Sequence, residues 1–150
     1  MDRYAIAVTA GDLNDHFDAA VLQQLADRTR IHGHAGARLL QTQAIYHGEQ
    51  LQRFIDAVKP DGVAILAGII PLKTEKTGPW LNANLPGVSV PADMLDAMEQ
   101  AAKEGRTRER GIELAARVVR EMKTVCHGVH IMAIGWEAEV PEILRSSGVR

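Results

Sequence analysis

The chain has 150 residues, 46% of them hydrophobic and 24% charged, which is the composition of one globular domain and excludes a disordered chain. Its 17 Lys and Arg residues against 19 Asp and Glu residues give a formal net charge of -2, which argues against nucleic acid or an anionic membrane as the main partner, because both require a clustered positive surface. A single cysteine, Cys126, excludes an intrachain disulfide, and the lack of a signal-peptide pattern or of a run of roughly 18 apolar residues leads us to expect a cytoplasmic protein.

The first part of the chain alternates between strand and helix patterns. Residues 4–8 (YAIAV) form a short apolar run that predicts a strand. Apolar residues at a spacing of four follow Asp12, which suits a helix N-cap, and they predict an amphipathic helix that ends near residues 31–34. Residues 35–43 then predict a second strand, entered through a glycine turn and ending at Gln43.

The alternation continues to the end of the chain. Residues 63–70 are apolar on both faces, which is typical of a parallel strand that is covered on both sides. Gly78 and Pro79 should disturb the short helix that follows this strand. The predicted elements are, in order, a helix over 49–58, a strand over 63–70, a short helix over 73–82, helices over 91–104 and 110–123, a strand over 127–134 and a helix over 137–146.

Four strand–helix units in succession predict an α/β fold with parallel strands and right-handed helical crossovers. Two architectures fit this pattern, an open doubly wound sheet and about half of a closed eight-stranded (β/α)8 barrel of the TIM type. The pattern alone does not choose between them. No linker or low-complexity segment divides the chain, so we expect residues 1–150 to form a single domain.

In both architectures ligands bind beyond the carboxyl ends of the parallel strands. Gln43 ends one strand, and its amide either binds a heterocycle with adjacent donor and acceptor atoms or is satisfied by loop backbone. Pro71 follows another strand and begins a segment that reaches Trp80. The rings of Trp80 and Trp136 each have two interpretations, stacking on a ligand or packing in the core.

Three other features favour structural interpretations. His32 and His34 form the closest histidine pair and have no acids or cysteines beside them, so we expect no metal site. Cys126 precedes His127, which could in principle activate the thiol, but a buried inert cysteine is the commoner case. The short basic run at residues 106–110 is interrupted by acids and is typical of a solvated helix start.

Four segments together resemble the methylenetetrahydrofolate reductase family, in the order and at the spacing of that family. The resemblance is close over about residues 35–148 and loose over 4–34. The four segments are residues 35–46 (AGARLLQTQAIY), 66–73 (LAGIIPLK), 82–91 (NANLPGVSVP) and 128–137 (GVHIMAIGWE).

The resemblance implies a fold and an activity. Members are flavin-containing (β/α)8 barrels in which FAD takes a hydride from NAD(P)H and passes it to 5,10-methylenetetrahydrofolate, giving 5-methyltetrahydrofolate for one-carbon and methionine metabolism. It places Gln43 at the glutamine that recognises the pterin and Trp80 on or next to the aromatic residue that stacks on the folate or nicotinamide ring. Thr77 falls at a neighbouring polar position, and Ile134 would line the same pocket.

The departures from the family concern the flavin side of the site. The chain resembles the C-terminal half of the family, and the absent half carries the catalytic acid and most of the flavin-binding loops. A lysine expected near the flavin phosphates is His32 here, and the first strand ends in Thr9-Ala10 instead of the family pattern. We therefore expect no catalytic residue in the chain, and activity only with a second copy or a separate N-terminal-half protein. The alternative is a non-catalytic folate-binding or regulatory module.

Overall fold

The computed structural model describes residues 39–58 and 62–149. They contain a three-stranded sheet in the order β1 (Leu39–Ala44), β2 (Ala64–Ile69) and β3 (Gly128–Ile131). β1 pairs with β2 and β2 with β3, both in parallel, as the alternation predicted. The strand expected at 4–8 and the helix after it lie outside the described residues.

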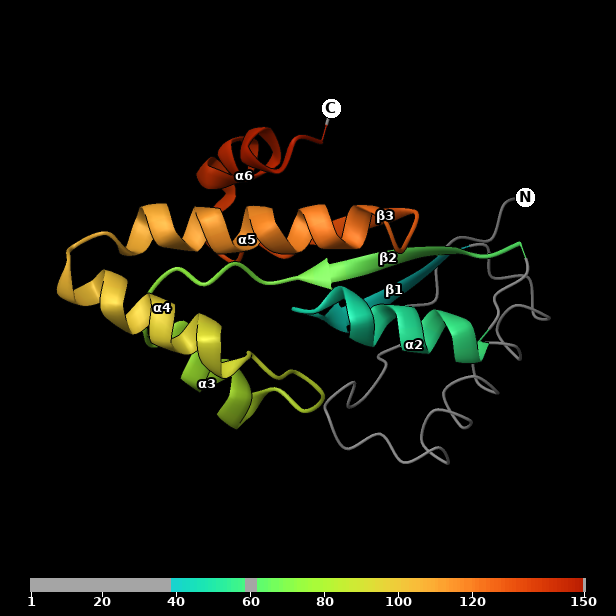
Figure 1. Cartoon of the computed structure of the whole chain (residues 1–150), viewed down its shortest axis with the longest axis horizontal. Helices are drawn as coiled ribbons and strands as arrows, with labels where there is room; N and C mark the ends of the chain where they lie inside the picture. The colour runs from blue at the N-terminus through green and yellow to red at the C-terminus, as the bar shows by residue number, and fades with distance from the viewer. Residues whose placement is uncertain (1–38, 59–61, 150) are drawn as a thin grey trace.

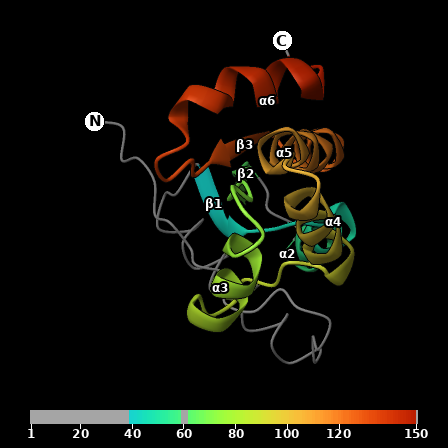
Figure 2. The ribbon, with the colours of Figure 1, turned by 90° about the vertical axis from the view of Figure 1, so that its left-hand side faces the viewer.

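Helices cover one face of this sheet. α2 (Gly48–Val58) buries Leu51 and Phe54, whose helical spacing predicted the element, and α5 (Thr107–Lys123) is the long central helix. In the end-on view of Figure 2, α2, α4 (Ala92–Lys103) and α5 lie on the same side of the sheet. α6 (Val140–Ser147) packs against α5. None of the helices within the described ranges is long and apolar enough to cross a membrane.

The two faces of the sheet differ in burial. In β1 the side chains of Leu40, Thr42 and Ala44 are buried, while the alternate ones are half-buried, and β2 begins with the same alternation. Side chains alternate between faces along a strand, so the buried set faces α2 and α5. The prediction of a β2 strand covered on both sides is therefore only partly correct, because Leu66 on the other face is half-buried.

Some helix boundaries differ from the predicted ones. α3 (Thr77–Asn84) begins four residues later than predicted and includes Pro79 without disturbance. A proline in the first turn removes an N–H that has no partner in the helix, so it is tolerated there. α5 begins at Thr107 instead of 110. The last predicted helix is divided into a short 3-10 turn, η1 (Glu137–Glu139), and α6.

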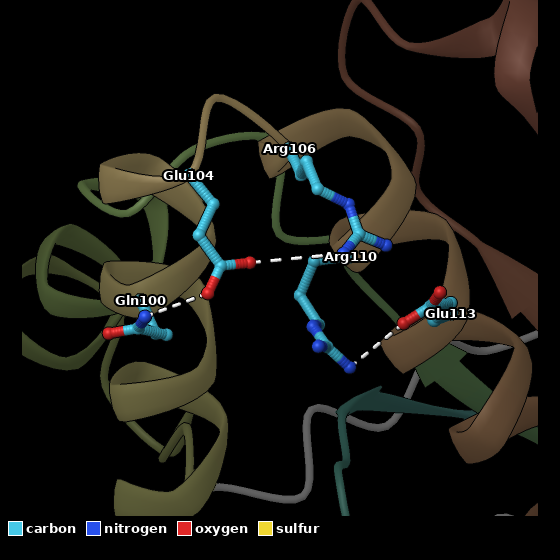
Figure 3. Close-up of polar contacts among 5 residues, drawn as sticks. All are labelled: Gln100, Glu104, Arg106, Arg110 and Glu113. Atoms are coloured by element: carbon cyan, nitrogen blue, oxygen red, sulfur yellow. Dashed lines mark hydrogen bonds and ion pairs between the residues drawn. The ribbon is translucent and has the colours of Figure 1, made fainter.

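The basic run at residues 106–110 is a solvated helix start, as expected. Figure 3 shows it at the junction of α4 and α5, where Arg106 lies 3.8 Å from Glu104 and Arg110 lies 2.9 Å from Glu113. All four side chains are exposed. Arg108 pairs with Glu139, so each arginine of the run has an acidic partner. Exposed ion pairs of this kind contribute little to stability.

Candidate functional site

A pocket of about 300 Å³ lies beyond the carboxyl ends of β2 and β3. In Figure 1, α3 and α4 lie beyond the arrowhead of β2, and α3 contributes its first residues to the pocket. The lining combines apolar side chains with threonine and lysine side chains. The lining residues are Ile70, Pro71, Lys73, Thr74, Lys76, Thr77, Trp80, Leu81, Ala133 and Ile134.

The structure brings three of the four sequence-predicted site residues together around this pocket. They are Thr77 and Trp80 from α3 and Ile134 from the loop after β3. Trp80 is 56% exposed and Ile134 is 61% exposed, and they are the exposed large hydrophobic side chains of the described chain. Large apolar side chains left in water beside a pocket are typical of a surface that a ligand covers.

Thr77 also has a local structural role. Its hydroxyl accepts a hydrogen bond from the Thr74 N–H at 3.2 Å and lies 3.3 Å from the Thr74 hydroxyl. These contacts hold the turn that leads into α3. Because the turn carries Trp80 on the following helical residues, Thr77 supports the orientation of the exposed ring as well as lining the pocket.

The structure separates the two tryptophans that the sequence left equivalent. Trp136 is half-buried and packs against the core, where its ring meets α5 at Gly111. A Cβ at Gly111 would lie 2.8 Å from the Trp136 ring and 2.2 Å from the Leu72 carbonyl oxygen. Trp136 therefore has the packing role, and Trp80 is the tryptophan that is free to stack on a ligand.

Lys73 is a pocket residue that sequence reasoning named only as part of a segment. Its Nζ donates a hydrogen bond of 2.5 Å to the carbonyl oxygen of Ile134, which joins the loops after β2 and β3. Ile134 has a φ of 49°, a conformation that a β-branched residue rarely adopts. Lys73 and the strained backbone of Ile134 are 61 residues apart in the chain, so no local sequence pattern reveals their contact.

The turn after Ile134 holds a carboxylate. The Gly135 N–H donates to Glu137 Oε1 at 3.0 Å, and Gly135 has a φ of 77°. This hydrogen bond, together with the nearby charge of Lys73, lowers the pKa of Glu137 below its usual value. Glu137 is not among the pocket-lining residues, and none of those residues is an acid, a histidine or a cysteine.

Gln43, the fourth predicted residue, is not among the lining residues of this pocket. It lies half-buried near the end of β1, where the pairing with β2 shifts register between Gln41 and Ala44. Within the described ranges its side-chain amide makes no hydrogen bond, and its role stays a prediction. The register shift is not visible in the sequence, because it depends on the partner strand.

Cys126 and His127 have structural roles. The Cys126 thiol donates towards the carbonyl oxygens of Met122 at 3.3 Å and Gly128 at 3.0 Å. His127 Nδ1 accepts a hydrogen bond from the N–H of Ile65 in β2 at 3.1 Å, so this nitrogen is not a base for the thiol. Among the described residues, no group of three or more His, Cys, Asp and Glu side chains is arranged to hold a metal ion.

The pocket fits a flat ring better than a dinucleotide. A volume of about 300 Å³ is at the lower end of the range for ligand sites, which typically span roughly 300–1,000 Å³. An exposed indole and a mainly apolar lining suit one aromatic ring system. A dinucleotide such as FAD needs more space than these residues enclose.

A parallel sheet with helical crossovers and a pocket past the strand ends define an α/β protein, compatible with a partial (β/α)8 unit. The profile of the family described as Methylenetetrahydrofolate reductase matches residues 14–148. The chain therefore belongs to this family, a family of folate-related oxidoreductases. The comparison with curated proteins gives no match.

Proposed function

We propose that the chain is the folate-binding part of a flavin-dependent methylenetetrahydrofolate reductase. The reaction is the reduction of 5,10-methylenetetrahydrofolate to 5-methyltetrahydrofolate with NAD(P)H as reductant. Family membership over residues 14–148 supports this, and the observation that carries it is the exposed Trp80 ring beside an apolar pocket at the strand ends. The p-aminobenzoyl ring of the substrate stacks on Trp80, with Thr77 and Ile134 beside it, and the amide of Gln43 binds the pterin edge.

The proposal includes an assembly that supplies the flavin side of the site. The pocket holds one ring system and has no acid in its lining, so the flavin and the catalytic acid come from other residues. The half-buried sheet face opposite α2 and α5, with Leu66 and the exposed His130 on it, is the kind of surface that a further barrel segment would cover. A second copy of the chain or a separate polypeptide that carries the first half of the barrel provides this cover.

The absence of an acid from the pocket lining also favours a second candidate. The chain would then bind a folate without transferring a hydride, as a folate-binding or regulatory module. The two candidates share the folate site and differ in the flavin. They are separated by measuring flavin binding and redox activity independently of folate binding.

Folate binding is tested by titrating the full chain with 5-methyltetrahydrofolate in a calorimeter. Trp80→Ala should weaken binding by about 5- to 150-fold, because stacking of a base-like ring on an aromatic side chain contributes about 1–3 kcal/mol. Pro79→Ala is the matched control, since Pro79 is exposed on the same turn and does not line the pocket. Equal affinity of the Trp80→Ala and Pro79→Ala proteins would refute the site.

The assembly is tested by adding FAD to the chain before size-exclusion chromatography and recording the visible spectrum of each peak. A flavin band that co-elutes with a dimer and is bleached by NAD(P)H supports the reductase formed by two copies. A colourless protein that still binds folate excludes the enzyme formed by this chain alone. Co-expression with a polypeptide that carries the first barrel half then separates the two-chain enzyme from the binding module.

A further inference from the structure

The end of β1 contains a β-bulge. Gln41 is paired with Leu66, and the next registered pair is Ala44 with Gly68. Thr42 and Gln43 therefore stand opposite the single residue Ala67 of β2. A bulge of this kind is uncommon between parallel strands, bends the strand that carries the extra residue, and is over-represented beside functional sites because it redirects a side chain.

The side chain of Thr42 takes the place of backbone in the interrupted ladder. Its hydroxyl accepts a hydrogen bond from the Gly68 N–H at 3.0 Å and donates one to the Gln43 carbonyl oxygen at 2.8 Å. Thr42 is only 5% exposed, so this hydroxyl is shielded from water where it replaces two backbone hydrogen-bond partners. An apolar side chain here would leave a buried N–H and a carbonyl oxygen unpaired, which is costly.

Gly68 allows the strands to approach closely at the bulge. A Cβ at this position would lie 2.5 Å from the Thr42 carbonyl oxygen and 2.8 Å from that of Gln43, so every side chain larger than hydrogen is excluded. The ladder resumes immediately afterwards, where the Ile45 N–H donates to the Gly68 carbonyl oxygen at 2.9 Å. The backbone of Gln43 is thus fixed on both sides.

The same segment is tied to the pocket. The buried Tyr46 hydroxyl donates a hydrogen bond of 2.9 Å to the carbonyl oxygen of Ile70, which lines the pocket. The hydrogen bonds of Thr42, Ile45 and Tyr46 therefore hold the end of β1 against the last residues of β2 and the pocket wall. Among the residues that the structure describes, the Gln43 side chain of this segment makes no hydrogen bond.

We propose that Thr42 is a positioning residue that determines ligand specificity, and this inference rests on the proposed folate site. Its hydroxyl holds the bulge that presents the Gln43 amide to the hydrogen-bonding edge of a bicyclic heterocycle. Thr42 touches no ligand itself. Removing the hydroxyl releases the Gln43 backbone and so weakens the binding of ligands that carry the heterocycle. The binding of ligands that contact only the Trp80 side of the site is unaffected.

The test compares two ligands, 5-methyltetrahydrofolate and p-aminobenzoylglutamate, which lacks the pterin. Both are titrated into the full chain in the presence of FAD. Thr42→Val keeps the shape of the side chain and removes the hydroxyl. It should weaken the binding of 5-methyltetrahydrofolate by about 10-fold, because one or two hydrogen bonds are lost, and should leave the binding of p-aminobenzoylglutamate unchanged. Thr42→Ser restores the hydroxyl and should bind both ligands within about twofold of the unmodified chain.

A double-mutant cycle tests whether Thr42 acts through Gln43. Gln43→Leu should show the same ligand-selective loss, and adding Thr42→Val to it should weaken 5-methyltetrahydrofolate no further, because residues that act as one unit are not additive. Retained binding of p-aminobenzoylglutamate reports that each variant is folded. If Thr42→Val does not fold, NMR of the unmodified chain still tests the contact between Gln43 and the pterin on which the inference depends. The Gln43 side-chain amide must then shift with 5-methyltetrahydrofolate and not with p-aminobenzoylglutamate.

Each other outcome overturns the inference in a recognisable way. Equal loss for both ligands, or none, in Thr42→Val shows a role in stability alone or no role. Additive losses in the double variant, or a Gln43 amide that does not respond to the pterin, show that Thr42 does not act through Gln43. An unmodified chain that binds neither ligand refutes the proposed function, and with it this inference.

Discussion

Replacement of Gly111 by alanine sets two effects of opposite sign against each other. Alanine is favoured over glycine in a helix interior by about 1 kcal/mol, so α5 considered alone should become more stable. The added Cβ would lie 2.2 Å from the Leu72 carbonyl oxygen and 2.8 Å from the Trp136 ring. Both distances are below 3.0 Å, which real Cβ atoms essentially never show, so something must move.

The neighbours of Gly111 decide the sign. A backbone oxygen does not rotate away as the end of a side chain does, so α5 must move from Leu72 by about 1 Å, and α5 packs against β2, β3, α4 and α6. Overpacking of this kind costs about 1–3 kcal/mol and more where backbone is displaced. We expect a net loss of about 2 kcal/mol, which lowers the melting temperature by roughly 4–8 °C for a chain of this length.

The assay is urea and thermal unfolding followed by circular dichroism, with Gly78→Ala as the matched control. A Cβ at Gly78 would lie 2.3 Å from Leu95 Cδ2, nearly the same overlap, but that atom is the end of a flexible side chain. Gly78→Ala should therefore change the free energy of unfolding by less than about 0.5 kcal/mol. If Gly111→Ala is as stable as Gly78→Ala or the unmodified chain, the rigid contact between α5 and Leu72 is wrong.

Further predictions concern single polar contacts and the exposed ring. Tyr46→Phe leaves the buried Ile70 carbonyl oxygen without its donor and should lower the free energy of unfolding by about 1–2 kcal/mol in urea titrations. Burial raises the pKa of Tyr46 above its usual range. The free energy of unfolding should therefore fall as pH rises past about 10, because the tyrosine ionises in the unfolded chain and not in the folded one. Tyr46→Phe should reduce this dependence of stability on pH. The Gly135 N–H lowers the pKa of Glu137, so the contribution of Glu137 to stability is present above its pKa in the unfolded chain and is lost as pH falls. Glu137→Gln should therefore flatten the acid side of a plot of urea midpoint against pH. An unchanged plot would contradict the contact. Trp80→Ala should change the free energy of unfolding by less than about 0.5 kcal/mol in urea titrations, because the ring is 56% exposed; a larger loss would assign Trp80 to the core.

Within residues 39–58 and 62–149, local sequence patterns predicted the element types and the α/β class with a parallel sheet. The spacing of Leu51 and Phe54 predicted α2, and the apolar run over 63–70 predicted β2 as a parallel strand, because each pattern depends on residues a few positions apart. The family resemblance, drawn from short segments in order, is confirmed over residues 14–148. The half-barrel, its partner and the roles of the four site residues remain predictions.

The boundaries and the shape of the site were decided by contacts between distant residues. Trp80 and Trp136 are equivalent in the sequence, and only the approach of α5 at Gly111 assigns Trp136 to packing. The bulge that carries Gln43 depends on Gly68 in the neighbouring strand, where no larger side chain fits.

A sequence pattern therefore determined which face of each element is apolar and in what order the elements follow, since propensity and periodicity are local properties. The tertiary structure alone decided which side chains remain exposed at the strand ends. Hydrogen bonds such as that from Lys73 to Ile134 join segments 61 residues apart, and their geometry exists only after the sheet and α5 have packed together. The physical reason is that close packing couples distant segments of the chain, and local spacing does not encode that coupling.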